Sequence, residues 1–398
     1  MDFSIPEPIR TVQLRVRNFV SEHIIPNENK VLEQDRRGER AAMSELQQTA
    51  RSMGLWTPHL PVELGGQGLG VLGMCALFRE MGRSMIGARV FHCDAPDQGN
   101  MDLLAKAAGP IIRQRYLEPL VRGEITSAFC MTEPAPGAGS DPSLLRTSAY
   151  WDGLQWVLDG HKWYSTGARD AAFLIVMART SNDRKSGATM FVVDRHAPGV
   201  SYVRDIPTMA EPLLAHREAE LKFDGVRLGP DAVLGEVGDG FGLAQARLVP
   251  ARLTHCMRWL GLADRTLTTC RDYLGSRMAF GKLLAEHQLV QLKIAEGATA
   301  ITTGNLLTFY CAHLLEHGNF ATAKTASSMA KTHVAQTLCK VLDDAIQLHG
   351  GKGYSDDLPF AQWYRHARAA RIADGPDEVH QLVVAREFLS GRFSLLGE

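Results

Sequence analysis

The sequence has 398 residues, more than one ordinary domain, and predicts two or three packed units. Its 43 Lys and Arg against 44 Asp and Glu leave a formal net charge of −1, which excludes a bulk electrostatic attraction to nucleic acid or anionic lipid. The 45% hydrophobic and 22% charged residues exclude general disorder, so we expect a folded protein that meets any phosphate group locally.

The cysteines and the apolar runs bear on the cellular compartment. Seven scattered cysteines without a CxxC pair argue against a disulfide framework and a structural zinc, so we expect no metal site. The longest clear apolar run, residues 171–178, is far shorter than the ~20 residues that span a bilayer. The acidic start MDFSIPEP does not resemble a signal peptide. We expect an intracellular protein without a membrane span, cytoplasmic if bacterial, with a mitochondrial or peroxisomal matrix left open.

The first third of the chain, residues 1–124, predicts an N-terminal helical domain. Apolar residues recur there at helical spacing, as at Val12, Val16 and Phe19. A glycine-rich segment over residues 63–70 predicts an interruption between helices.

The middle of the chain, residues 125–237, predicts a β-domain, either a barrel or a sandwich. Short alternating or β-branched runs are separated there by Gly, Pro, Asn and Asp. The pair Asp159 and Gly160, between QWVL and HKWY, predicts a tight hairpin, because a type I′ turn requires positive φ at both central residues.

The last part, residues 238–398, predicts a C-terminal four-helix bundle, because apolar residues return at a spacing of three and four. The expected helices cover residues 241–273, 289–316, 323–348 and 378–389. Helices before and after a β-domain give an α+β class that is mostly α, with three domains.

The sequence lacks the catalytic motifs that are typical of several large enzyme classes. Walker A, HExxH and GxSxG sequences are absent, and we do not expect an NTPase, a zinc protease, a serine hydrolase or a Rossmann protein. Glycines within residues 350–353 suit either an approach to phosphate or a helix end. The segment MTEPAPGAGSD, residues 131–141, suits a binding loop or a plain surface loop. The aromatic pair Trp163 and Tyr164 suits a wall for a planar cofactor or ordinary core packing.

Read together, four segments resemble the acyl-CoA dehydrogenase family in order and separation across nearly the whole chain. They are AFCMTEPAPGAGSD, DGHKWYSTGA, RMAFGKLLAEHQ and QLHGGKGYSDDLPFAQWYRHARAARIADGPDEVH. FHCDAPDQGNMDLL and IADGPDEVH are most similar to the branch whose animal members carry this dehydrogenase after a kinase-like domain, which has no counterpart in this sequence. The resemblance implies an FAD-dependent enzyme of fatty acid β-oxidation that converts an acyl-CoA to a trans-2-enoyl-CoA. It also implies a homodimer or homotetramer that shares FAD between subunits and passes electrons to an electron-transfer flavoprotein.

The resemblance further implies which residues contact FAD and substrate. Thr132 would bond the N5 and O4 edge of the flavin, and Arg277 would pair with the pyrophosphate of a neighbouring subunit's cofactor. The implied FAD contacts are Met131, Thr132, Gly139, Ser140, Tyr164, Thr166, Arg277, Phe280, Gln288, Gln347, Gly350, Gly351 and Glu378. The implied substrate contacts are Ser140, Arg252 and Gly375.

Such chemistry needs one carboxylate that faces the substrate across the flavin and removes the proton alpha to the thioester. Most of the family has a Glu in the turn before the last helix, and Asp374 matches that position. A minority has its Glu where this sequence has Ala251, which cannot act as a base. Local pattern alone makes Asp374 an ordinary turn residue before Gly375 and Pro376. Burial would raise its pKa and a nearby helix N-terminus would lower it, and the sequence leaves the balance open.

Several departures from the family keep other functions open. Asp is one methylene shorter than Glu, so backbone or substrate must lie closer to the base. The loop TEPAPGAGSD is two residues longer than the usual TEPGAGSD, and Pro376 replaces a small hydroxyl residue. One alternative is a flavin oxidase of the nitroalkane type, which uses an aspartate base. Another is a flavin-binding protein without turnover, as among relatives that associate with DNA, although the neutral charge does not favour a nucleic-acid partner.

Overall fold

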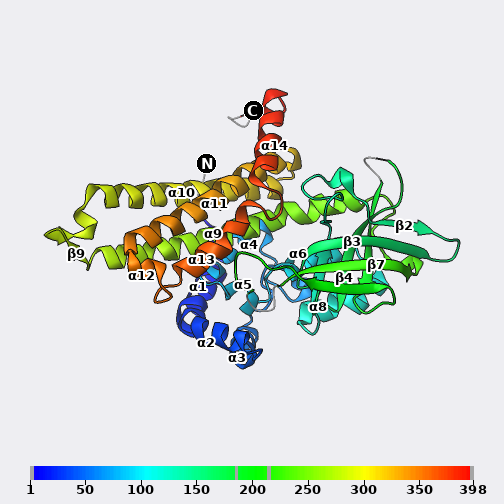
Figure 1. Ribbon diagram of the computed structural model, residues 1–398, viewed down its shortest axis with the longest axis horizontal. Helices are drawn as coiled ribbons and strands as arrows, with labels where there is room; N and C mark the ends of the chain where they lie inside the picture. The colour runs from blue at the N-terminus through cyan, green and yellow to red at the C-terminus, as the bar shows by residue number, and fades with distance from the viewer. Residues whose placement is uncertain (1–3, 184–186, 213–216, 395–398) are drawn as a thin grey trace.

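The computed structural model describes residues 4–183, 187–212 and 217–394. Residues 1–3 of the predicted N-terminal domain and residues 395–398 of the predicted C-terminal domain lie outside these ranges. Helices of the N-terminal part and of the C-terminal part pack together, and the strands form a separate layer at one end of the molecule (Figure 1).

The N-terminal part is helical, as predicted. Its helices are α1 (Glu7–Phe19), α2 (Ile25–Arg36), α3 (Ala41–Ser52), α4 (Gly70–Met81), α5 (Gly87–Val90), α6 (Asp97–Ala107), α7 (Pro110–Ile112) and α8 (Glu118–Arg122). The predicted glycine-rich interruption is confirmed, because α4 begins only at Gly70. Residues 68–73 read GxGxxG, but no strand precedes them in the described chain, so the strand–turn–helix setting of a dinucleotide-binding loop is absent.

Two glycines let α4 cross the long helix α9 (Gly240–Leu274) with backbone against backbone. A Cβ on Gly261 of α9 would lie 2.4 Å from the carbonyl oxygen of Arg79. A Cβ on Gly82, just after α4, would lie 2.2 Å from the carbonyl oxygen of Arg258. Side chains at these positions would force the helices apart, and the shared core around this crossing holds both helical parts together.

The middle part forms an eight-stranded sheet in the order β6-β7-β3-β2-β4-β5-β8, with β1 parallel to β4. The strands are β1 (Ser127–Cys130), β2 (Ser148–Trp151), β3 (Trp156–Thr166), β4 (Phe173–Arg179), β5 (Ala188–Asp194), β6 (Val200–Asp205), β7 (Glu218–Leu228) and β8 (Val233–Leu234). Side chains of β4 alternate between two cores. Phe173 and Ile175 pack with helical residues such as Leu104, whereas Leu174 packs with Leu221 of β7. The sheet therefore curves over its own inner face, as a barrel or sandwich does.

The predicted hairpin at Asp159 and Gly160 is wrong, because β3 runs through this pair without turning. The tight turn lies at residues 152–155, between β2 and β3, and Gly153 has the positive φ of 105°. The register of β3 against β7 shifts between Leu158 and Gly160, so the pair forms an irregularity within the ladder. Glycine is needed at 160 because a Cβ there would lie 2.4 Å from Oγ1 of Thr147.

The four predicted C-terminal helices are confirmed as α9, α10 (Gln288–Glu316), α11 (Phe320–His349) and α14 (Asp377–Leu389). Shorter helices α12 (Gly351–Tyr354) and α13 (Phe360–Ala367) and a two-stranded ribbon, β9 (Met278–Ala279) and β10 (Lys282–Leu283), complete this part. Helix α9 starts beside the sheet and ends at the opposite tip of the molecule, where the ribbon lies (Figure 1). The rings of Tyr273 and His349 stack 4.3 Å apart, so α9 and α11 end together.

Two further features concern the whole described chain. None of its helices combines the length and the apolar character needed to cross a bilayer. All seven cysteines are free, and six of them are buried.

Candidate active site

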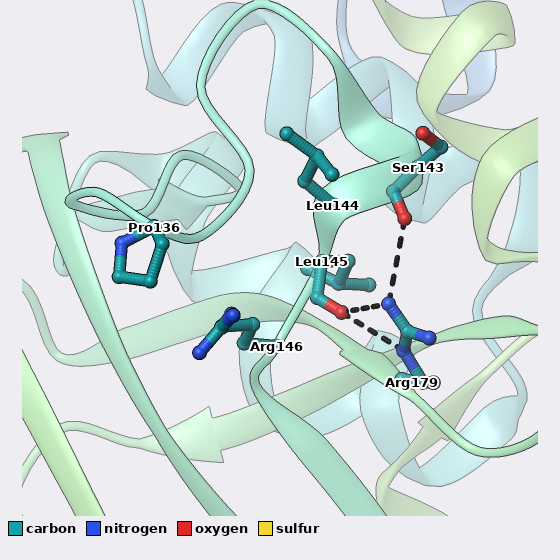
Figure 2. A pocket seen from close by; sticks show the side chains of 6 residues that line it. All are labelled: Pro136, Ser143, Leu144, Leu145, Arg146 and Arg179. Carbon is teal, nitrogen blue, oxygen red and sulfur yellow. Dashed lines mark hydrogen bonds between the residues drawn. The ribbon is translucent and has the colours of Figure 1, made fainter.

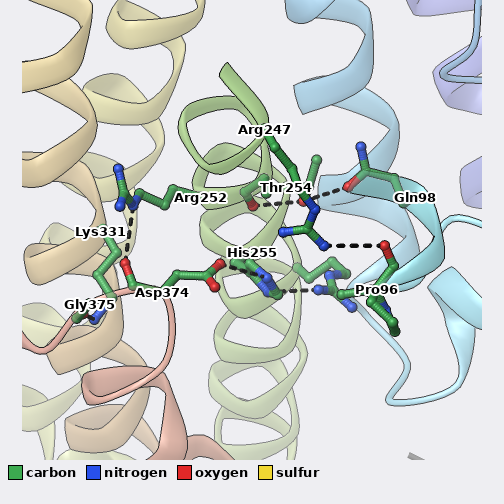
Figure 3. Close-up of polar contacts among 12 residues, drawn as sticks. Pro96, Gln98, Arg247, Arg252, Thr254, His255, Lys331, Asp374 and Gly375 are labelled. Carbon is green, nitrogen blue, oxygen red and sulfur yellow. Dashed lines mark hydrogen bonds and ion pairs between the residues drawn. The ribbon is translucent and has the colours of Figure 1, made fainter. Parts of the chain in front are cut away.

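Asp374 occupies a strained turn whose backbone carbonyl groups accept hydrogen bonds from three side chains. Its φ is 54°, and Gly375 follows with a φ of 103°. Nε of Arg252 donates to the carbonyl oxygen of Asp374 at 3.2 Å, and Nε2 of His380 donates to the same oxygen at 3.1 Å. Nζ of Lys331 donates to the carbonyl oxygen of Gly375 at 2.7 Å (Figure 3). A left-handed non-glycine residue persists only where its surroundings fix it, so this turn is preorganised.

Asp377, the first residue of α14, anchors the other side of this turn. Its side chain is 2% exposed and lies 3.6 Å from the ammonium group of buried Lys331. It also accepts hydrogen bonds from Arg371 at 2.7 Å and Gln336 at 3.2 Å. Burial lowers the pKa of Lys331, and the attraction of Asp377 opposes that effect. The ion pair between Lys331 of α11 and Asp377 of α14 thus fixes the turn to α11.

The carboxylate of Asp374 points toward His255 of α9 (Figure 3). Oδ2 lies 3.1 Å from Nε2 of His255, and the side chain is 24% exposed. Burial alone would raise the pKa of Asp374, but His255, Arg247 and Arg252 outweigh burial and hold that pKa well below its usual range. The balance that the sequence left open is therefore resolved toward the ionised form. An ionised, partly accessible carboxylate is able to accept a proton.

Arg247 links this carboxylate to the predicted flavin loop. Its Nε donates to Oδ1 of Asn100 at 2.9 Å, and its guanidinium carbon lies 4.1 Å from the ring centroid of Phe129 in β1. Burial lowers the pKa of Arg247 to about 10, so it stays charged at neutral pH. Because Met131 and Thr132 follow β1 directly, the predicted base and the start of the predicted flavin loop lie against the same end of α9.

The loop after β1 is shaped around Glu133, a residue that the sequence analysis did not select. Its carboxylate accepts hydrogen bonds from the backbone amides of Ala138 at 3.1 Å and of Arg146 and Thr147 at 2.8 Å. Nζ of Lys162 pairs with it at 2.9 Å. These groups, Lys162 foremost among the opposing charges, overcome burial and lower the pKa of Glu133 to about 2. A lysine on the inward face of an apolar strand was the available signal for this pair.

The aromatic pair predicted to wall the flavin lies beside Thr132. The backbone amide of Trp163 donates to the carbonyl oxygen of Thr132 at 3.1 Å. The ladder of β3 and β7 shifts register between Lys162 and Ser165, and Tyr164 within this bulge has a φ of 50° and is 47% exposed. Bulges of this kind re-aim side chains next to functional sites.

The residues present around this bulge fit a flavin. The exposed ring of Tyr164 offers a flat apolar wall, and the buried indole Nε1 of Trp163 has no hydrogen-bond partner in the described chain. An unpaired buried donor is costly unless a further group satisfies it. Thr132 is half-buried at the same place, whereas the hydroxyl of Thr166 donates to Glu218 at 2.9 Å. Gly139 and Ser140 are exposed farther along the loop.

The remaining predicted flavin residues do not join this group within one chain. Arg277, Phe280 and Gln288 lie at or near the β9–β10 ribbon, at the end of the molecule opposite the sheet (Figure 1). Phe280 is 96% exposed with a φ of 52°. Three further predicted contacts, all exposed, lie at the end of α11, which reaches the same tip: Gln347, Gly350 and Gly351. Glu378 is exposed in the first turn of α14.

A cavity of about 550 Å³ lies at the end of the predicted flavin loop (Figure 2). It is lined by Pro136, Ser143, Leu144, Leu145, Arg146 and Arg179. Nε of Arg179 donates to the carbonyl oxygen of Leu145 at 2.8 Å and fixes the end of the loop to β4. None of the predicted site residues lines this cavity.

A helical part, a sheet and a second helical part, with an aromatic bulge in the sheet and a fixed carboxylate turn between the helices, are the features of a flavin-dependent dehydrogenase. Three models of the acyl-CoA dehydrogenase family match in sequence: the N-terminal domain over residues 6–124, the middle domain over 128–226 and the C-terminal domain over 238–389. The chain therefore belongs to the acyl-CoA dehydrogenase family, and FAD is its cofactor.

Individual relatives agree with this assignment. FadE2 of Mycobacterium tuberculosis, named as a probable acyl-CoA dehydrogenase, is 38% identical over 98% of this chain and 97% of its own length. Rat acyl-CoA dehydrogenase family member 11 is 36% identical over 94% of this chain, which spans only 49% of that relative. A Mycobacterium abscessus structure, described as a candidate acyl-CoA dehydrogenase, aligns with a TM-score of 0.92 at 36% identity and covers 98% of this chain and 100% of its own. A glutaryl-CoA dehydrogenase bound to glutaryl-CoA aligns with a TM-score of 0.86 at 26% identity, over 98% and 97% of the two chains.

Proposed function

We propose that the protein is an FAD-dependent acyl-CoA dehydrogenase whose base is Asp374. The observation that carries the proposal is the fixed turn, which presents an ionised and partly accessible carboxylate beside α9. The base removes the α proton of the thioester, and bound FAD supplies the acceptor for the hydride from the β carbon. Structural relatives named as glutaryl-CoA and butyryl-CoA dehydrogenases support a CoA thioester as the substrate.

Each part of the site has a separate task in this reaction. Arg252, His380 and Lys331 hold the turn through backbone carbonyl groups, so none of these three contacts uses the carboxylate that takes the proton. Thr132 and the bulge at Trp163 and Tyr164 would bind and orient the flavin ring. Glu133 keeps the loop in the required shape.

The test is anaerobic flavin reduction by a panel of CoA thioesters, followed by absorbance. Asp374→Asn should retain its yellow flavin and lose at least ~100-fold in the rate of bleaching, because general-base catalysis contributes about 10²–10⁴-fold. Asp343→Asn, which changes an exposed carboxylate of α11, is the matched control and should bleach like the wild type. Normal bleaching of Asp374→Asn would reject this base.

The same panel separates the proposal from the two alternatives. Peroxide production from small nitroalkanes, with no response to any CoA ester, would identify an oxidase. A bound flavin that no substrate reduces, with retention on DNA at physiological salt, would identify a binding protein. Faster reoxidation by an electron-transfer flavoprotein than by oxygen is the result that our proposal expects.

We also propose that FAD is shared between subunits of a homodimer or homotetramer. The support is the separation of the predicted flavin residues into two exposed groups at opposite ends of one chain, since a single cofactor would need a second copy to reach both. Arg277→Ala should lower the ratio of FAD to protein, and Arg10→Ala on α1 should not. Light scattering should report a dimer or tetramer, and a monomer with full FAD content would contradict this proposal.

A further inference from the structure

His255 lies between the proposed base and a second charged pair. Its Nε2 is 3.1 Å from Oδ2 of Asp374, and its Nδ1 is 2.7 Å from Nη2 of Arg258. Nη1 of Arg258 pairs in turn with Oδ1 of Asp94. The side chains of His255 and Arg258 are each 18% exposed, and that of Asp94 is 14% exposed. Four side chains from three separate segments thus form one continuous row.

This row determines which nitrogen of His255 carries the ring proton. A guanidinium group only donates and is always charged, so Nδ1 of His255 must accept from Arg258. The single proton of the neutral ring is then on Nε2, which faces Asp374. A proton on Nδ1 would oppose an N–H of Arg258 at 2.7 Å. The ring of Trp259 stacks on His255 at 5.4 Å, which restricts rotation of the imidazole.

The consequence concerns the direction of the carboxylate. The backbone of Asp374 is already fixed, and only the two side-chain torsions remain. Oδ2 is buried and lies 3.1 Å from Nε2 of His255, at ion-pair distance but without the alignment of a hydrogen bond in the described chain. A group that occupies Oδ2 leaves Oδ1 as the oxygen for the proton.

We propose that His255, held as the Nε2–H tautomer by Arg258 and Asp94, is a positioning residue that directs Oδ1 of Asp374 toward the substrate. This inference rests on the proposed function, because it assumes that Asp374 is the base. Other charged groups that act on the carboxylate are Arg247 and Arg252 on α9, and Lys331, Asp377 and His380 surround the turn from α11 and α14. The attraction of Arg247 and Arg252 for the carboxylate persists when His255 is substituted.

The first experiment compares His255→Leu with His255→Gln in the flavin-loaded enzyme. Leucine removes the donor, so kcat should fall about 10- to 100-fold with little change in KM, the scale expected for a misdirected base. Glutamine keeps an uncharged N–H donor and should recover most of this loss. Because His255 is one of the groups that lower the pKa of Asp374, the acidic limb of the kcat/KM profile, which in the wild type lies below the usual range of an aspartate, should move to higher pH in the leucine variant. His196→Leu, at an exposed position in the turn between β5 and β6, is the control.

The second experiment does not depend on turnover. Selective ¹⁵N-histidine labelling of the full-length enzyme, with His255→Gln used to assign the signal, should show His255 as the Nε2–H tautomer. Arg258→Gln should introduce a population with the proton on Nδ1. A wild-type pH profile and kcat in His255→Leu, equal losses in the leucine and glutamine variants, or a wild-type Nδ1–H tautomer would each overturn the inference. Failure of the wild type to react with any CoA ester would instead reject the proposed function, while the tautomer result would stand.

Discussion

Nζ of Lys162 lies 2.9 Å from Oε1 of Glu133, and the two side chains are 0% and 3% exposed. This ion pair joins β3 to the loop that follows β1. Lys162 also donates to the carbonyl oxygen of Met131 at 2.9 Å, so a single ammonium group fixes both the start of the loop and the glutamate that shapes it. The backbone amides of Arg146 and Thr147 connect the end of the loop to the same carboxylate. The proposed flavin site therefore depends on a buried charge pair that the flavin itself would not contact.

Removal of either partner should destabilise the protein strongly. Lys162→Met leaves Glu133 buried without its counter-charge, and such losses cost about 3–5 kcal/mol. Lys162→Met combined with Glu133→Gln should cost less than the sum of the two single changes, because no isolated charge remains. Urea unfolding of the four proteins measures this coupling. Glu387→Gln, which breaks an exposed pair with Arg392, is the control and should keep the wild-type midpoint. Additive single effects would contradict the coupling.

The same pair predicts a loss of stability in acid. The folded-state pKa of Glu133 is lowered to about 2, below the unfolded value of about 4.3. Ionised Glu133 therefore contributes roughly 3 kcal/mol to the free energy of unfolding above about pH 4.3, and this contribution is lost as the pH falls toward about 2. The urea midpoint should drop over this window in the wild type and drop less in Lys162→Met, which lacks the main attractive charge. Parallel curves for both proteins would show that other carboxylates control the acid transition.

Sequence periodicity was sufficient for the large elements. The helices α9, α10, α11 and α14 begin and end within a few residues of the predicted ranges, because their apolar faces are continuous in sequence. The Asp–Gly pair at 159–160 was misread because a glycine forced by a close neighbour gives the same local pattern as a glycine that turns. A second Asp–Gly pair, at Asp152 and Gly153, makes the turn.

The residues that hold the candidate site in place could not be predicted from local sequence patterns. Asp374 was predicted from its place before the last helix, but His255, Lys331 and Glu133 act through partners far away in sequence. Nothing in the local pattern around a helical histidine tells which carboxylate it will meet. The packing of α9, α11 and the turn brings His255 and Lys331 to their partners, and the packing of β3 against the loop after β1 brings Lys162 to Glu133.

Gly160→Ala tests the close approach that misled the hairpin prediction. The new Cβ would lie 2.4 Å from Oγ1 of Thr147, whose backbone amide donates to Glu133. Displacement of Thr147 should therefore lower the free energy of unfolding by about 1–3 kcal/mol, as overpacking does, and weaken flavin retention. Gly229→Ala, with a φ of −66° and no atom within 4 Å of the added Cβ, should be neutral in both measurements. Equal stability of the two variants would show that Thr147 moves without cost.

Asp374→Glu tests whether this site needs the shorter base, although most of the resembled family has glutamate there. The turn is fixed by Arg252, His380 and Lys331, so the extra methylene must move the carboxylate away from His255 or toward the substrate. A misplacement of about 1 Å costs on the order of 10²-fold in rate, and we expect a loss of that size in kcat with flavin content unchanged. Stopped-flow reduction by the best thioester of the panel measures the effect. Because His255 and two arginines hold the pKa of Asp374 below its usual range, the wild type should show no acidic limb from this residue between pH 5 and 8. Full activity of the glutamate variant would mean that the acyl group, rather than the turn, adjusts to the base.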